Sequence, residues 1–134
     1  MVKNFTLIEV NKIPNKGRGI IATQDIPQGT LIEVAPVGIF SLEKIPNINE
    51  TEIFKYYFVK PLEYGKSKNL NGYIVFGLAS LCNHAENPNA RVDWIENEIG
   101  LWSHLIADQT INKGQEVTLL YTNIDEYADA NKFV

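Results

Sequence analysis

The stretch Leu81-Cys82-Asn83-His84-Ala85-Glu86-Asn87-Pro88-Asn89-Ala90 is the most informative part of this 134-residue chain. Cys82 is the single cysteine of the sequence, which excludes an internal disulfide and a cysteine-based zinc cluster and favours a buried small apolar residue. The side chain of Asn83 carries both a hydrogen-bond donor and an acceptor, so it can bind a polar ligand. The neighbouring Pro88 also allows a turn or cap role for Asn83, and His84 can be an ordinary core histidine. The segment alone therefore leaves a ligand site and a structural turn open.

Two further segments lie far from this one in the sequence. Upstream, Lys16-Gly17-Arg18-Gly19-Ile20 is followed by Ile26-Pro27-Gln28-Gly29. Downstream, Ile111-Asn112-Lys113-Gly114-Gln115-Glu116-Val117-Thr118 leads to Tyr121. Glycines at 17 and 19 let a backbone approach a ligand closely, because no Cβ stands in the way. Taken alone, the same glycines also fit an ordinary loop.

Together and in this order, the three segments resemble the SET-domain protein-lysine methyltransferases, over about residues 5–122. The resemblance implies S-adenosylmethionine as cofactor and a protein lysine as substrate. By the same resemblance, the cofactor-binding residues are Lys16, Gly17, Arg18, Gly19, Asn83 and His84. Arg18 and His84 are expected to act mainly through their backbones. We therefore expect Arg18→Lys to be milder than Gly19→Val.

Tyr121 is the predicted catalytic residue, because the family places its tyrosine at the end of the last strand, beside the methyl-transfer channel. Its phenolic oxygen would align the lysine amine, which must be neutral to attack although free lysine has a pKa of about 10.4. A nearby sulfonium and an apolar channel both lower that pKa. The alternative for Tyr121 is a strand-end aromatic residue that packs on the core.

A channel for a lysine side chain needs aromatic walls, which shield the alkyl stem and favour a cation over the ring face. The predicted lysine-channel residues are Tyr73, Phe76 and Tyr127, with Phe133 as a further candidate. Each of them can equally be a core or surface aromatic residue.

Turn signals return every few residues, which predicts a mainly β fold of short strands, and the resemblance implies the SET β-clip arrangement with one or two short helices. The predicted strands are 5–10, 20–23, 30–34, 37–41, 91–95, 99–107 and 116–121. The predicted turns include Asn15–Gly19, Pro27–Gly29 and Glu96–Glu98. A helix is predicted over Asn49–Phe58, where Asn49 and Glu52 form a capping box, and a short helical turn over Gly77–Asn83. The polar stretch Leu62–Asn71 is a predicted loop.

An internal echo links two distant stretches. Ala22, Ile26, Gly29 and Ile32 have the same spacing as Ala107, Ile111, Gly114 and Val117. Each stretch is typical of a strand end, a turn with glycine and a new strand. The echo indicates either a repeated structural unit or two unrelated turns that both use glycine.

Composition limits the function. Hydrophobic residues make up 45% of the chain and charged residues 21%, which predicts one ordinary folded domain. The net charge of −4 argues against direct nucleic-acid binding and favours a basic partner, such as a lysine-rich protein segment, a histone among them. No signal peptide, membrane span or metal site is expected, so the prediction is a soluble intracellular protein of the cytoplasm or nucleus.

The sequence also departs from the family pattern. Ala85 stands where serine is usual, and Gln115 where the family often has an acid. We expect a single domain over 1–134, whose tail 123–134 either closes the channel or leaves the lid to a second subunit of a homodimer. Three readings compete: an active methyltransferase, a non-catalytic binding module on the same scaffold, and an unrelated small β domain. The last predicts that Gly17, Asn83 and Tyr121 lie far apart.

Overall fold

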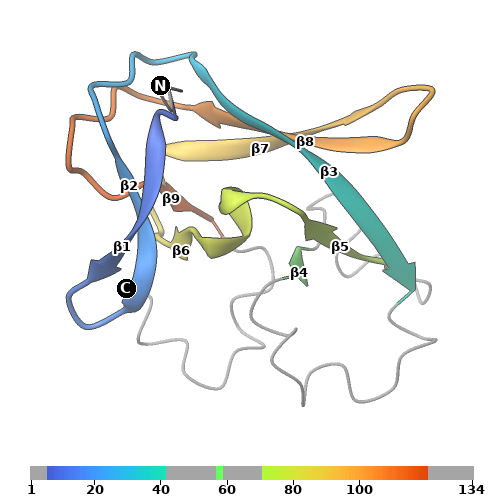
Figure 1. The fold of residues 1–134 in the computed structure, drawn as a ribbon, viewed down its shortest axis with the longest axis horizontal. Helices are drawn as coiled ribbons and strands as arrows, with labels where there is room; N and C mark the ends of the chain where they lie inside the picture. Colours follow the sequence, from blue (N-terminus) through green and yellow to red (C-terminus); the bar gives the residue numbers. More distant parts are fainter. Residues whose placement is uncertain (1–5, 42–56, 59–70, 121–134) are drawn as a thin grey trace, which may run out of the picture.

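Short strands dominate the structure, a computed structural model that describes residues 6–41, 57–58 and 71–120 (Figure 1). The strands are β1 (Ile8–Ile13), β2 (Gly17–Ala22), β3 (Leu31–Ser41), β4 (Tyr57–Phe58), β5 (Asn71–Val75), β6 (Asn83–His84), β7 (Ala90–Glu96), β8 (Leu101–Ala107) and β9 (Thr118–Leu119). They form a β1–β2 hairpin, a five-stranded sheet in the order β4-β5-β3-β8-β7, and a β6–β9 pair. The short 3-10 helix η3 (Leu78–Leu81) leads into β6. The predicted mainly β fold is confirmed.

The β1–β2 hairpin contains the first of the three sequence segments, Lys16–Ile20. Its antiparallel register runs from Ile8 opposite Ala22 to Ile13 opposite Gly17. The prediction placed the first strand at 5–10, but pairing with β2 extends it to Ile13 through two polar residues. The turn after it uses a positive φ at Asn15 and at Gly17, of 66° and 78°. Tertiary pairing has therefore overridden the local hydrophobic pattern.

β3 is one continuous strand, whereas the sequence predicted two strands separated at Pro36. The part from Leu31 to Pro36 pairs with β8, and the part from Val37 to Ser41 pairs with β5. The strand changes its partner at the residue that has no N–H to donate, and the Pro36 carbonyl accepts the amide of Phe76 at 3.0 Å. The proline thus marks a change of neighbour instead of a break.

The remaining elements agree in part with the sequence. The short helical turn is confirmed as η3, and the β7–β8 hairpin is confirmed with a longer turn, so that Ile99 lies in the turn and is 83% exposed. β5 and β6 were not predicted. The end of the predicted helix 49–58 is wrong, because Tyr57–Phe58 form β4, which pairs with β5. The rest of that helix and most of the predicted loop 62–71 lie outside the described residues.

The internal echo corresponds to a symmetric contact between the two stretches. Ile26 and Ile111 exchange two backbone hydrogen bonds of 2.7 and 2.8 Å. The Gly29 amide donates to the Ala107 carbonyl, and the Gly114 amide donates to the Ala22 carbonyl, both at 2.8 Å. The two glycines have φ of 87° and 84°, which side chains disfavour. The echo is therefore one structural unit used twice, and the two copies pair directly through the Ile26–Ile111 bridge.

The core joins the sheets to the site. Its largest fully buried apolar side chains are Ile20, Ile26, Cys82, Leu105, Ile111 and Val117. They come from β2, β8, the segment before β6 and both turns of the echo. In Figure 1, η3 and β6 lie between β2 and the five-stranded sheet, so the Asn-His segment runs through the middle of the molecule. Any ligand site built on it is anchored to the core.

Glu33 of β3 holds the start of η3. Its carboxylate accepts the backbone amides of Leu78 and Ala79 at 3.0 and 3.2 Å, which otherwise have no partner within so short a helix. A Cβ on Gly77 would lie 2.6 Å from a Glu33 carboxylate oxygen. Glu33 therefore acts as a cap for η3 that is supplied by β3.

Loss of this cap should destabilise the fold. We predict that Glu33→Ala lowers the free energy of unfolding by about 1–2 kcal/mol, because two amides lose their acceptor. Glu33→Gln, which keeps one acceptor oxygen, should lose less. Urea denaturation followed by fluorescence measures this, with Glu9→Ala on the exposed face of β1 as the control. A Glu33→Ala variant as stable as Glu9→Ala would contradict the capping role.

Candidate functional site

The side-chain amide of Asn83 connects the three sequence segments. Its Nδ2 donates to the backbone carbonyl of Arg18 at 3.3 Å and to a carboxylate oxygen of Glu116 at 2.7 Å. These partners lie on β2 and just before β9. Asn83 is 6% exposed, so the contacts are shielded from water. The structure thus brings together the three sequence segments that were predicted to share a site.

The two glycines of the first segment serve different needs. A Cβ on Gly19 would lie 2.7 Å from Asn83 Nδ2 and 2.8 Å from a Glu116 carboxylate oxygen, closer than real Cβ atoms approach. Gly17 has open space but a φ of 78°. Gly19 is therefore required by packing against the site itself, and Gly17 by the shape of the turn.

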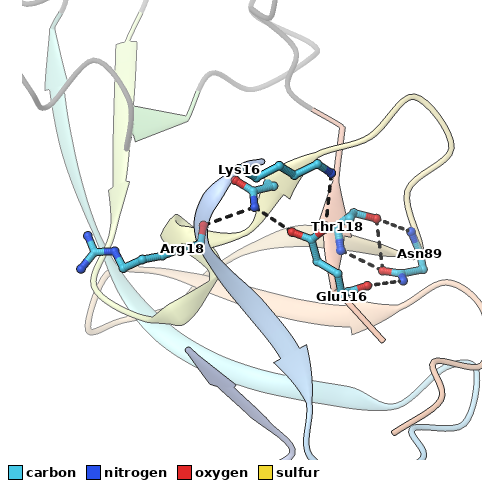
Figure 2. Close-up of polar contacts among 6 residues, drawn as sticks. Lys16, Arg18, Asn89, Glu116 and Thr118 are labelled. Atoms are coloured by element: carbon cyan, nitrogen blue, oxygen red, sulfur yellow. Dashed lines mark hydrogen bonds and ion pairs between the residues drawn. The ribbon is translucent and has the colours of Figure 1, made fainter. Parts of the chain in front are cut away.

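Lys16 adds the cationic group of the site. Its Nζ lies 3.4 Å from the second carboxylate oxygen of Glu116, and both side chains are largely buried, with 22% and 17% exposure. Arg18 contributes its carbonyl to Asn83 while its side chain points outward (Figure 2). This contact is with Asn83, and the backbone role of Arg18 toward the cofactor stays a prediction.

A second polar contact holds β6 beside β9. The Asn89 side chain donates to the Glu116 carbonyl at 2.8 Å and accepts the Thr118 amide at 2.9 Å. The backbone amide of Asn89 also donates to the Thr118 hydroxyl. These bonds fix the parallel pairing of Asn83 with Thr118. Asn89, from the Pro88–Asn89 part of the central segment, thus helps to hold the Asn83–His84 part beside β9.

The ionisation of the site follows from its burial. Burial raises the pKa of the Cys82 thiol, and the negative charges of Glu33 and Glu116 raise it further. The thiol therefore stays protonated and acts as a core residue, as the sequence indicated. Burial also lowers the pKa of His84, against the smaller raising effect of Glu86. His84, 2% exposed, is thus favoured as a neutral ring.

The predicted aromatic residues fall in different places. The Tyr73 ring is buried and packs against Trp94, with centroids 5.4 Å apart, and Phe58 meets the same indole edge-on. Phe76 is 65% exposed, and its ring lies beside Gly38. Tyr121, Tyr127 and Phe133 lie outside the described residues. The roles of these aromatic residues therefore remain predictions.

Sequence reasoning missed two acidic residues, Glu116 in the site and Glu33 at the start of η3. The sequence predicts no separate role for Glu116 within the third segment and none for Glu33. A half-buried carboxylate next to an amide and a lysine cannot be recognised from spacing, because its partners lie 33 and 100 positions away. The only sequence signal for Glu116 was its place in the third segment.

The hairpin with its glycine turn, the central asparagine segment and the last strand define a SET-type β fold around one polar site. The family model of the SET domain matches residues 17–122. The chain therefore belongs to the SET-domain family, and the reading as an unrelated small β domain is wrong.

Two curated proteins and one solved structure are similar to this chain. A Schizosaccharomyces pombe histone-lysine N-methyltransferase, H3 lysine-37 specific, is 28% identical over 85% of this chain and 72% of its own length. A Saccharomyces cerevisiae histone-lysine N-methyltransferase, H3 lysine-36 specific, is 32% identical over 97% of this chain but only 18% of its own length. The Neurospora SET domain protein DIM-5, a histone lysine methyltransferase, matches 87% of this chain and 52% of that chain with a TM-score of 0.63 and 19% identity. The structural match confirms the fold.

Neither a metal-binding cluster nor a membrane-spanning helix is present in the described residues. Over residues 6–41, 57–58 and 71–120, no group of three or more His, Cys, Asp or Glu side chains is placed to hold a metal ion. In the same ranges, no helix has the length and apolar character needed to cross a membrane.

The contact at Gly19 gives a direct test of the site geometry. We predict that Gly19→Ala lowers the free energy of unfolding by about 2 kcal/mol, because the new methyl group separates the β2 backbone from the Asn83 and Glu116 side chains. Arg18→Lys keeps the carbonyl and should change stability by less than about 0.5 kcal/mol. Paired urea titrations measure both. Equal effects of the two substitutions would contradict the packing shown here.

Proposed function

We propose that this chain transfers a methyl group from S-adenosylmethionine to the amine of a lysine side chain in a protein. The observation that supports this most is the Asn83 amide, held by the Arg18 carbonyl and the Glu116 carboxylate, with the Lys16 ammonium beside the same carboxylate. Membership of the SET family gives the reaction class.

The polar groups fit the amino-acid end of this cofactor. That end carries an ammonium and a carboxylate group. Asn83 Oδ1 makes no hydrogen bond with any described residue, so it offers an acceptor for the ammonium. Lys16 offers a cation for the carboxylate. When bound, the cofactor supplies a methyl group activated by its sulfonium.

The protein's contribution to methyl transfer would be alignment and desolvation. The lysine nitrogen must be held in line with the methyl group, and correct alignment is a large term in the rate. It must also be neutral, and an apolar channel lowers its pKa toward that state. We assign the alignment to the Tyr121 hydroxyl and the channel walls to Tyr73, Phe76 and Tyr127.

The substrate we propose is a basic histone segment. The named relatives are histone H3 lysine methyltransferases, and the chain carries a net charge of −4, which attracts a lysine-rich partner. Such a substrate would place the protein in the nucleus. We propose one SET domain with its core over about 5–122 and a tail that closes the channel, in the same chain or across a homodimer.

Transfer of a labelled methyl group tests the activity. The purified chain should transfer tritiated methyl from S-adenosylmethionine to a protein in a panel of core histones, and peptides with single lysine-to-arginine changes should locate the site. Histones with all lysines acetylated are the control and should accept none. Cofactor binding with no transfer to any histone or lysine-rich protein would favour the non-catalytic module.

Tyr121 gives the matching variant. We predict that Tyr121→Phe lowers kcat by about a hundredfold, because the amine loses its aligning hydroxyl. Cofactor affinity, measured by calorimetry, should stay within about threefold of the original value, because the variant keeps the ring and the Asn83 contacts. Unchanged kcat in this variant would remove Tyr121 from the mechanism.

A further inference from the structure

Glu116 is the most connected side chain of the site. One carboxylate oxygen accepts Asn83 Nδ2 at 2.7 Å, and the other lies 3.4 Å from Lys16 Nζ. Its backbone carbonyl accepts a hydrogen bond from the Asn89 side chain, and Glu116 forms an isolated β-bridge with Ile21 of β2. Figure 2 shows Glu116 between Lys16 on one side and Asn89 on the other. Each of its two oxygens therefore already has a donor group of this chain as its neighbour.

The surroundings of Asn83 determine which way its amide points. Both neighbours of Nδ2, the Arg18 carbonyl and the Glu116 carboxylate, are acceptors without protons. Turning the amide over would place Oδ1 against those two oxygens, with no proton between them. The carboxylate makes this reversal especially unfavourable, because bonds to charged groups are the stronger ones. Oδ1 must then face away from Glu116.

We propose that Glu116 is a positioning residue that locks the Asn83 amide so that its oxygen is presented to the ammonium of an amino-acid-bearing ligand. Through its other oxygen, Glu116 keeps the Lys16 ammonium near the same place, where it attracts the ligand carboxylate. The inference rests on the proposed function, since it assumes that S-adenosyl compounds bind here. The inference makes Glu116, which acts through Asn83 and Lys16, responsible for selecting ligands that carry an amino-acid end.

The Glu116 carboxylate is held in a defined position beside Asn83. The Asn89 side chain donates to the backbone carbonyl of Glu116, and Gly19 leaves room for its carboxylate beside Asn83. Its side chain is 17% exposed, so water competes weakly for the Asn83 amide. The contacts that orient the Asn83 amide are therefore the same ones that join β2, β6 and the approach to β9.

Calorimetry with two ligands separates this role from general stabilisation. S-adenosylhomocysteine carries the amino-acid end, and 5′-methylthioadenosine lacks it. We expect Glu116→Ala to raise the Kd of S-adenosylhomocysteine by about tenfold. The Kd of 5′-methylthioadenosine should change by less than about twofold. Glu116→Gln, whose amide oxygen can still accept Asn83 Nδ2, should restore most of the difference. Glu98→Ala, an exposed acid in the β7–β8 turn, is the matched control and should change neither ligand.

The outcomes are distinguishable. Equal weakening of both ligands, or full retention of the preference in Glu116→Ala, overturns the positioning role while leaving the proposed function standing. If the unchanged chain binds neither ligand, the proposed function fails first, and this inference falls with it.

A measurement on the unchanged protein covers the case in which Glu116→Ala does not fold. In NMR spectra, the two Asn83 Nδ2 protons should exchange slowly with solvent and remain protected when S-adenosylhomocysteine is added, because the ligand uses the oxygen. Loss of that protection on binding would mean that the amide turns over, and this would overturn the proposal.

Discussion

The hydrogen bond from Asn83 to the Glu116 carboxylate is the constraint on which the rest of the site depends. It joins β6 to the approach of β9, and the Arg18 carbonyl on the same amide adds β2. Gly19 is required because these two side chains leave no room for a Cβ. The neutral Asn83 amide thus lies beside the Arg18 carbonyl and the Glu116 carboxylate, with the Lys16 ammonium nearby. Asn83 gives the site an acceptor oxygen, and Lys16 gives it a cation.

The fold supports this contact from outside the site. The two glycine turns of the echo fix where β2 ends and where the segment before β9 begins, and Glu33 fixes the start of η3. Asn89 then holds Thr118, so that β6 and β9 lie parallel. Each of these contacts joins residues distant in sequence. The site is consequently a property of the whole domain, and a change in a remote cap or turn should be felt at Asn83.

Sequence reasoning identified the fold class and three segments that the structure brings together, while the roles of their residues toward a cofactor stay predictions. Gly19, Asn83 and the backbone of Arg18 do meet, and η3 and the β7–β8 hairpin lie where turn and alternation signals placed them. It failed where pairing decides the outcome: β3 passes through Pro36 because it changes partner there, and Tyr57–Phe58 form a strand because β5 lies beside them. Glu116 and Glu33 were missed because their partners are set by the tertiary fold, and Tyr121 and Tyr127 lie outside the described residues.

A crystal structure of the chain with S-adenosylhomocysteine tests the central claim most directly. Our account predicts that Asn83 Oδ1 lies within hydrogen-bond distance of the ligand's amino nitrogen, while Nδ2 stays on the Glu116 carboxylate and the Arg18 carbonyl. The phenol of Tyr121 should lie near the ligand sulfur. A ligand bound elsewhere, or an Asn83 amide that has left Glu116 to meet the ligand with its nitrogen, would contradict it.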